Sequence, residues 1–198
     1  MAAAVAGYAL LSHLLMLHAA DRPWAVAALF GPLVLGVSGI ALQRRHLPSM
    51  LGCAALVLLL AAVVVRGGVA DVSRLYVLQH AAIHAVLAWS FAITLRPNAT
   101  ARVTQFAEFV HKQLTPAMRA YTRRLTGWWA AYFVAMTAAS PTLFALAPWA
   151  WWSFFANVLT PLFAITFFFV EHALRYRLHP EFERVGLKAG LHAYRASR

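Results

Sequence analysis

Residues 121–177 contain two apolar segments that share one uncharged turn, and this pattern constrains the fold more than any other. The first segment follows Arg123 and Arg124, the turn is Ala147-Pro148, and Arg175 follows the second segment. About 20 apolar residues are enough for a helix to cross a bilayer core of about 30 Å. Because cations are retained on the cytoplasmic side of a membrane, arginines at both far ends predict a membrane hairpin whose far ends share that side.

The composition extends this prediction to the whole chain. Hydrophobic residues make up 62% of the 198 residues, whereas soluble domains contain about 45 to 50%. We therefore predict an all-α fold, a polytopic transmembrane helical bundle of about six spans that forms a single integral membrane domain over residues 1–198. The predicted spans are residues 3–19, 24–42, 49–65, 75–95, 125–146 and 149–174.

The charge distribution predicts the orientation of this bundle. Lys and Arg total 17 against 6 Asp and Glu, and 14 of the 17 cations fall in the second and fourth loops and the tail. The positive-inside rule then predicts a multi-pass protein of the bacterial inner membrane with both termini in the cytoplasm. No nucleic-acid partner is predicted, because there is no basic soluble domain with interleaved aromatic residues.

Two cytoplasmic segments carry most of these cations, the loop at residues 96–124 and the tail at residues 175–198. The loop is predicted to contain an amphipathic helix, because apolar residues recur at helical spacing at Val103, Phe106, Ala107, Val110 and Leu114. Such a helix either lies on the inner leaflet or packs against the protein's own helices. Eight cations are predicted to contact headgroups of membrane lipids or a partner: Arg96, Arg102, Lys112, Arg119, Arg123, Arg124, Arg175 and Arg177.

Polar residues inside predicted spans are candidates for a ligand cavity or a proton relay, because such groups are costly in a bilayer. They are His13, His18, Gln79, His80, His84 and Asn157. If the first and fourth spans touch, the four histidines line one polar seam; the simpler alternative is that they hydrogen-bond between helices. No cofactor and no metal are predicted. Because His80 and His84 are one helical turn apart, haem or a metal between them stays an open alternative.

Glu171 and His172 lie at the inner end of the last span and are the candidates for a catalytic acid or base. The alternative for Glu171 is an ion pair with Arg175, one helical turn later. Pro141 and Pro161 interrupt the two helices of the hairpin, and such breaks either open a cavity or form plain kinks.

Several segments of the chain resemble a small family of uncharacterised proteobacterial membrane proteins. They are Tyr121-Thr122-Arg123-Arg124-Leu125-Thr126, Trp128-Trp129, Tyr132-Phe133, Trp152-Ser153-Phe154-Phe155-Ala156-Asn157, Phe169-Val170-Glu171-His172, and the stretches 78–97, 114–116 and 180–182. Members of this family are encoded beside acyl-carrier-protein, ketosynthase and acyltransferase genes in clusters for aryl polyene and xanthomonadin-type pigments. At the position of His172 they commonly have Tyr.

The resemblance implies an inner-membrane accessory protein of aryl polyene or fatty-acid-like lipid and pigment biosynthesis. In this hypothesis the basic loop and tail anchor or position soluble enzymes or acyl carrier protein, which is strongly acidic, at the membrane. Two other functions stay open: a membrane carrier or flippase for a hydrophobic product, and an integral enzyme that acts on lipid headgroups through Glu171.

Overall fold

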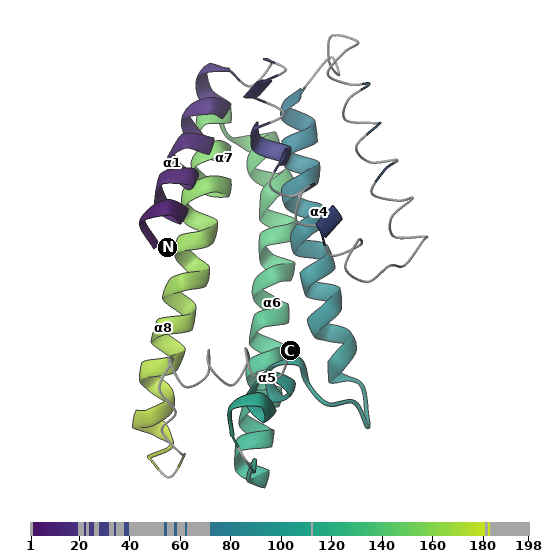
Figure 1. Ribbon diagram of the computed structural model, residues 1–198, viewed down its shortest axis with the longest axis vertical. Helices are drawn as coiled ribbons and strands as arrows, with labels where there is room; N and C mark the ends of the chain where they lie inside the picture. Colours follow the sequence, from purple (N-terminus) through teal and green to yellow (C-terminus); the bar gives the residue numbers. More distant parts are fainter. Residues whose placement is uncertain are drawn as a thin grey trace. The chain divides into compact units, whose positions relative to one another are not determined.

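The computed structural model describes residues 2–19, 22, 24–25, 28–31, 34, 38–39, 54, 58, 62, 72–111, 113–180 and 182 (Figure 1). Every regular element among these residues is a helix, which confirms the all-α prediction. In chain order the elements are α1 (Ala2–His18), α4 (Val72–Ala92), the 3₁₀-helix η1 (Ile93–Leu95), α5 (Arg102–Val110), α6 (Pro116–Leu146), α7 (Trp149–Phe154), the π-helix η2 (Phe155–Leu159) and α8 (Thr160–Leu178).

Three of these helical segments are long and apolar enough to span a membrane: Ser73–Leu95, Pro116–Leu146 and Trp149–Leu178. They correspond to the predicted spans at residues 75–95, 125–146 and 149–174. The predicted first span is also a helix, α1, with 17 residues. The predicted spans at residues 24–42 and 49–65 lie outside the described residues apart from isolated positions.

The fifth predicted span begins earlier than hydropathy indicated. Thr115 caps the start of α6, because its hydroxyl oxygen accepts a hydrogen bond from the Met118 backbone N–H at 3.2 Å. Pro116 follows at the first helical position, where its missing N–H costs nothing. The helix therefore begins at Pro116 instead of Leu125, and its first three turns carry Arg119, Arg123 and Arg124.

The second helix of the hairpin changes its hydrogen-bonding pattern before a proline. Pro161 has no backbone N–H, so it cannot donate to the carbonyl of Asn157. The π-helix η2 occupies the five residues before α8, at this position, and single π-helical turns often occur at functional sites. Pro141 lies inside α6, which continues through it, and Thr137 on the preceding turn donates its hydroxyl to the Phe133 carbonyl at 2.8 Å.

The chain forms two compact units. The first unit comprises Met1–Leu78 and Ala147–Leu159, and the second comprises Gln79–Leu146 and Thr160–Arg198. In the first unit α1 packs against α7 and η2, and Trp152 is fully buried. In the second unit the last turns of α4, all of α5, the first turns of α6 and the last turns of α8 lie at one end (Figure 1). The prediction of one domain over the whole chain stays a prediction.

Candidate functional site

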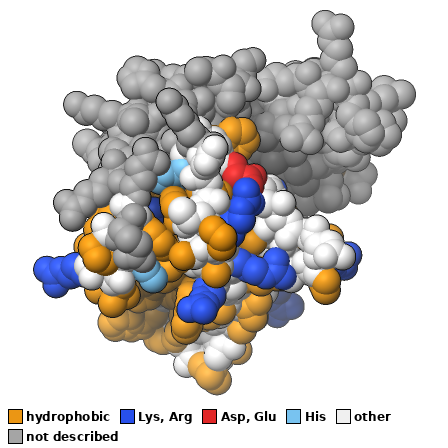
Figure 2. Space-filling view, turned by 90° about the horizontal axis from the view of Figure 1, so that it is seen from below, with side chains coloured by type: hydrophobic (Ala, Val, Ile, Leu, Met, Phe, Trp, Pro, Cys, Tyr) orange, Lys and Arg blue, Asp and Glu red, His pale blue; other side chains and the backbone are white. Residues whose placement is uncertain are grey.

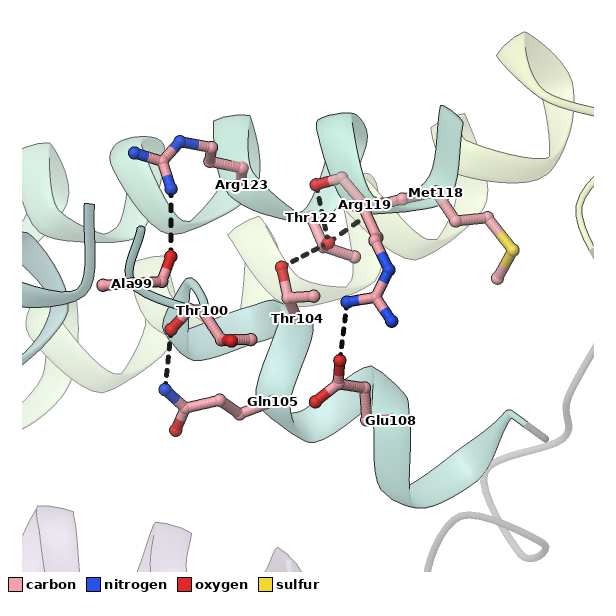
Figure 3. A network of polar contacts seen from close by, with 9 residues as sticks. All are labelled: Ala99, Thr100, Thr104, Gln105, Glu108, Met118, Arg119, Thr122 and Arg123. Atoms are coloured by element: carbon pink, nitrogen blue, oxygen red, sulfur yellow. Dashed lines mark hydrogen bonds and ion pairs between the residues drawn. The ribbon is translucent and has the colours of Figure 1, made fainter. Parts of the chain in front are cut away.

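Helix α5 packs along the first turns of α6 in the opposite direction. The Val103 N–H donates to the Thr126 hydroxyl at 3.1 Å, and the buried Thr104 and Thr122 hydroxyls lie 2.7 Å apart. Nearer the other end of α5, Arg119 forms an ion pair with Glu108 (Figure 3). The alternative that this helix packs on the protein's own helices is therefore confirmed.

The prediction of an apolar stripe along α5 is only partly correct. α5 ends at Val110, so Leu114 lies beyond it. Its protein-facing side is polar, since Thr104 is 4% exposed, whereas the rings of Phe106 and Phe109 are about half exposed. Small hydroxyl-bearing residues allow the two helices to approach closely, and the large apolar side chains are left on the outer side.

Arg123 caps the carboxyl end of η1 from the neighbouring helix. Its guanidinium group donates to the backbone carbonyls of Leu95, Arg96 and Ala99. Figure 3 shows the bond to Ala99, which is 3.3 Å long. Helix ends leave such carbonyls without partners inside the helix and carry partial negative charge. Arg123 therefore holds α6 against the end of the fourth predicted span.

Arg102 has a similar internal role. It donates to the Ser90 carbonyl at 3.3 Å and to the Gln105 side-chain oxygen at 3.2 Å. Its backbone N–H also donates to the Thr94 hydroxyl at 3.0 Å. Of the predicted partner-contacting cations, Arg102 and Arg123 are thus engaged inside the protein.

Besides Arg119, which pairs with Glu108, three of the other predicted cations are exposed at this end of the second unit: Arg96, Arg124 and Arg177. We call this set the cationic end. Arg96 lies over the Trp89 ring, 6.0 Å from its centroid, while the guanidinium groups of Arg124 and Arg177 form no ion pair within the described chain. Seen from this end, basic side chains are spread among apolar ones (Figure 2). Lys112 lies outside the described residues.

Glu171 forms a bidentate ion pair with Arg175. The Arg175 Nε and Nη2 atoms donate to the two carboxylate oxygens at 2.8 and 2.6 Å, and the Tyr121 hydroxyl donates to one of them at 2.7 Å. The Glu171 carboxylate is 7% exposed. This geometry confirms the predicted ion pair and leaves the carboxylate well satisfied, which favours a structural role over that of a general base.

The aromatic side chains beyond α8 extend this cluster. The rings of His179 and Phe182 stack with their centroids 4.5 Å apart, and both make T-shaped contacts with the Tyr121 ring. Phe182 is buried. The start of the predicted cytoplasmic tail is therefore anchored to α6 through Tyr121.

The first unit contains a polar cluster around Ser153, which is fully buried on α7. His13 Nδ1 lies 2.8 Å from the Ser153 hydroxyl oxygen. Asn157 donates its side-chain N–H to the Ser153 carbonyl at 2.9 Å and to the Met16 sulfur at 3.1 Å. Two predicted residues, His13 and Asn157, are thus brought together by a serine that joins α1 to the interrupted helix.

The second unit contains a separate histidine cluster on α4. The rings of His80 and His84 are 4.3 Å apart, and His84 Nδ1 donates to the His80 carbonyl at 2.7 Å. His80 Nε2 lies 3.3 Å from the Thr160 hydroxyl, and the Tyr132 hydroxyl donates to the Thr160 carbonyl at 2.8 Å. The simpler prediction, histidines bonded to other helices, is confirmed for His80 and, in the first unit, for His13.

The other predicted residues have less defined surroundings. His18 is exposed at the end of α1, Gln79 is half-buried on α4, and His172 lies between the rings of Phe168 and Tyr176 on α8. No group of three or more His, Cys, Asp or Glu within the described ranges is placed to hold a metal ion. The predicted seam of four histidines and the metal or haem alternative stay predictions.

Comparison with known proteins adds no assignment. No family model, no curated protein and no solved structure matches this chain.

Three residues that organise these clusters had no role in the sequence-based predictions: Tyr121, Tyr132 and Ser153. Hydroxyl groups in apolar helices are common, so their presence alone does not distinguish them. One available signal was spacing, because Ser153 and Asn157 are one turn apart on a helix.

Proposed function

We propose that the chain is a six-span protein of the bacterial inner membrane with both termini in the cytoplasm. Three apolar helices and the 17-residue α1 support this proposal, together with the distribution of cations along the sequence. The 31 residues of α6 measure about 46 Å as a helix, longer than a bilayer core of about 30 Å. Because Arg119, Arg123 and Arg124 lie in its first turns, the excess length extends from the membrane at that end.

The function that this geometry supports best is that of an accessory membrane subunit, and the family resemblance of the sequence suggests aryl polyene or similar lipid and pigment biosynthesis as its setting. In this role the cationic end positions an acidic soluble partner, such as acyl carrier protein, at the inner leaflet. The observation that carries the proposal is the unbalanced charge of this end. Glu108 and Glu171, the two acidic residues that the structure describes, already pair with Arg119 and Arg175, so among the described residues no carboxylate balances Arg96, Arg124 and Arg177, whose charge can attract an acidic partner.

Helix α5 also supports a position of the cationic end at the inner leaflet. Its threonine side packs on α6, and we propose that Phe106 and Phe109 on its outer side contact the lipid of the inner leaflet. Aromatic side chains next to cations are typical of membrane interfaces. The amphipathic helix is then bound to the protein and to the membrane at once.

The test reverses the charge of the cationic end alone. Arg96, Arg124 and Arg177 are replaced together by Glu, and recovery of purified acyl carrier protein is measured at low and high salt. We expect recovery to be lost in the variant, and to be lost with salt in the wild type. The control is Arg22→Glu, an exposed cation of the first loop, which should leave recovery unchanged. Equal recovery by the triple variant and the wild type contradicts the docking function.

A second candidate function is a membrane carrier for a hydrophobic product. The π-helix η2 and the polar groups of Ser153 and Asn157 favour it, because interrupted helices with polar side chains can line a substrate path. Product should then accumulate in the inner membrane of a deletion strain while synthesis continues. Docking instead predicts reduced synthesis, so metabolite profiling of that strain separates the two functions.

A further inference from the structure

A hollow of about 400 Å³ lies where α5 ends and α6 begins, within the second unit. It is lined by Glu108, His111, Gln113, Leu114 and Arg119. This volume is within the range of small-molecule sites, about 300 to 1,000 Å³. Its lining includes a cation, an anion and an amide, together with one aliphatic side chain. A ligand that fits these groups carries both a negative and a positive charge.

The ion pair at the edge of this hollow can be exchanged for such a ligand. Arg119 Nη1 and Glu108 Oε1 are 2.7 Å apart, and their side chains are 53% and 40% exposed (Figure 3). Exposed pairs of this kind contribute only about 0 to 1 kcal/mol. A zwitterion that gives its anion to Arg119 and its cation to Glu108 keeps both side chains paired.

The position of the hollow along α6 points to a membrane source for this ligand. Arg119 lies six residues before Leu125, where the apolar part of α6 begins, so it is about 9 Å further along the helix axis. This distance is comparable with the thickness of a headgroup layer, since the full bilayer of about 40 to 45 Å exceeds its core by some 5 to 8 Å on each side.

Two exposed aromatic side chains, Phe106 and Phe109, lie on the outer side of α5 and do not line the hollow. Because α5 runs opposite to α6, Phe106 is nearer to Thr126 and Phe109 is nearer to the hollow. These rings are 53% and 50% exposed. They place apolar surface on α5 at the level between Arg119 and the apolar part of α6.

We propose that this hollow binds one phospholipid whose headgroup carries a phosphate and a primary ammonium, as phosphatidylethanolamine does. Arg119 and Gln113 donate to the phosphate oxygens, and Glu108 accepts from the ammonium. Its acyl chains extend from there toward the apolar part of α6. A quaternary ammonium has no N–H to donate and a glycerol headgroup has no cation, so both should bind less well.

The test counts bound lipid on the full-length protein by native mass spectrometry. The protein is released from detergent micelles that contain phosphatidylethanolamine, phosphatidylglycerol or phosphatidylcholine. We expect phosphatidylethanolamine to bind best and Arg119→Gln to weaken it about tenfold. Glu108→Gln should remove the preference over phosphatidylcholine. Arg124→Gln, an exposed cation away from the hollow, is the matched control and should bind like the wild type.

Two further measurements identify the source of the ligand and guard against misfolding. Glycerophosphoethanolamine, the headgroup without chains, should bind much more weakly than the lipid. Gln113→Leu does not touch the ion pair and should still weaken binding several-fold. Equal binding of the soluble headgroup refutes the lipid source. Preference for phosphatidylglycerol, or wild-type binding by Arg119→Gln, refutes the site. This site does not depend on the docking function, which uses other cations.

Discussion

Replacement of Arg123 by Gln tests the most specific structural role found in this protein. Arg123 donates to three backbone carbonyls at the end of η1 and in the turn after it. Gln is too short and has no charge to balance the helix end. Hydrogen bonds to charged groups contribute about 1.5 to 3 kcal/mol in favourable cases. Because Arg123 is partly exposed, we expect Arg123→Gln to lower the free energy of unfolding by about 2 kcal/mol in total. This is near the low end of the value for a single such bond.

The assay is thermal unfolding in one detergent at one scan rate, because membrane proteins often unfold irreversibly. For a chain of this size, 2 kcal/mol corresponds to a decrease in Tm of about 4 to 8 °C. Arg123→Lys keeps the charge but not the forked geometry, so an intermediate decrease is expected.

The neighbouring arginine provides a matched control for this prediction. Arg124 has the same charge and neighbouring sequence, but its side chain is exposed and forms no ion pair in the described part of the chain. Arg124→Gln should therefore change stability by less than about 0.5 kcal/mol. Equal Tm values for Arg123→Gln and Arg124→Gln would show that the cap does not stabilise the protein.

Three further predictions concern the buried polar groups. Glu171→Gln should destabilise the protein by about 1 to 3 kcal/mol, because it removes the countercharge of Arg175. The double variant Glu171→Gln with Arg175→Met should recover part of this stability. Thermal unfolding of both variants tests the prediction, and a wild-type Tm for Glu171→Gln contradicts it. Ser153→Ala should lower the free energy of unfolding by about 1 to 2 kcal/mol, since His13 loses its hydrogen-bond partner. Limited proteolysis should then cleave α1 faster than in the wild type. Thr104→Val keeps the shape but breaks a buried hydroxyl pair, so about 1 kcal/mol should be lost; a wild-type denaturation midpoint would show that α5 is held by other contacts.

Sequence alone predicted the all-α class of this chain and three of its long apolar helices. The long apolar segments at residues 75–95, 125–146 and 149–174 are helices because a bilayer-sized apolar run has few other ways to satisfy its backbone. The ion pair of Glu171 with Arg175 was also predictable, because residues one helical turn apart are neighbours in any helix. The order of residues along the chain was sufficient to predict both the apolar helices and this ion pair.

Only the tertiary structure decided which polar residues act together. Arg123 and Arg124 are adjacent and chemically identical, yet one caps η1 and the other is exposed, because their directions differ around α6. Likewise, Ser153 contacts both Asn157, one turn away, and His13, which is 140 residues away in the sequence. Such contacts depend on how helices pack side by side, and hydrophobic periodicity specifies which face of a helix is apolar but not which neighbour it meets.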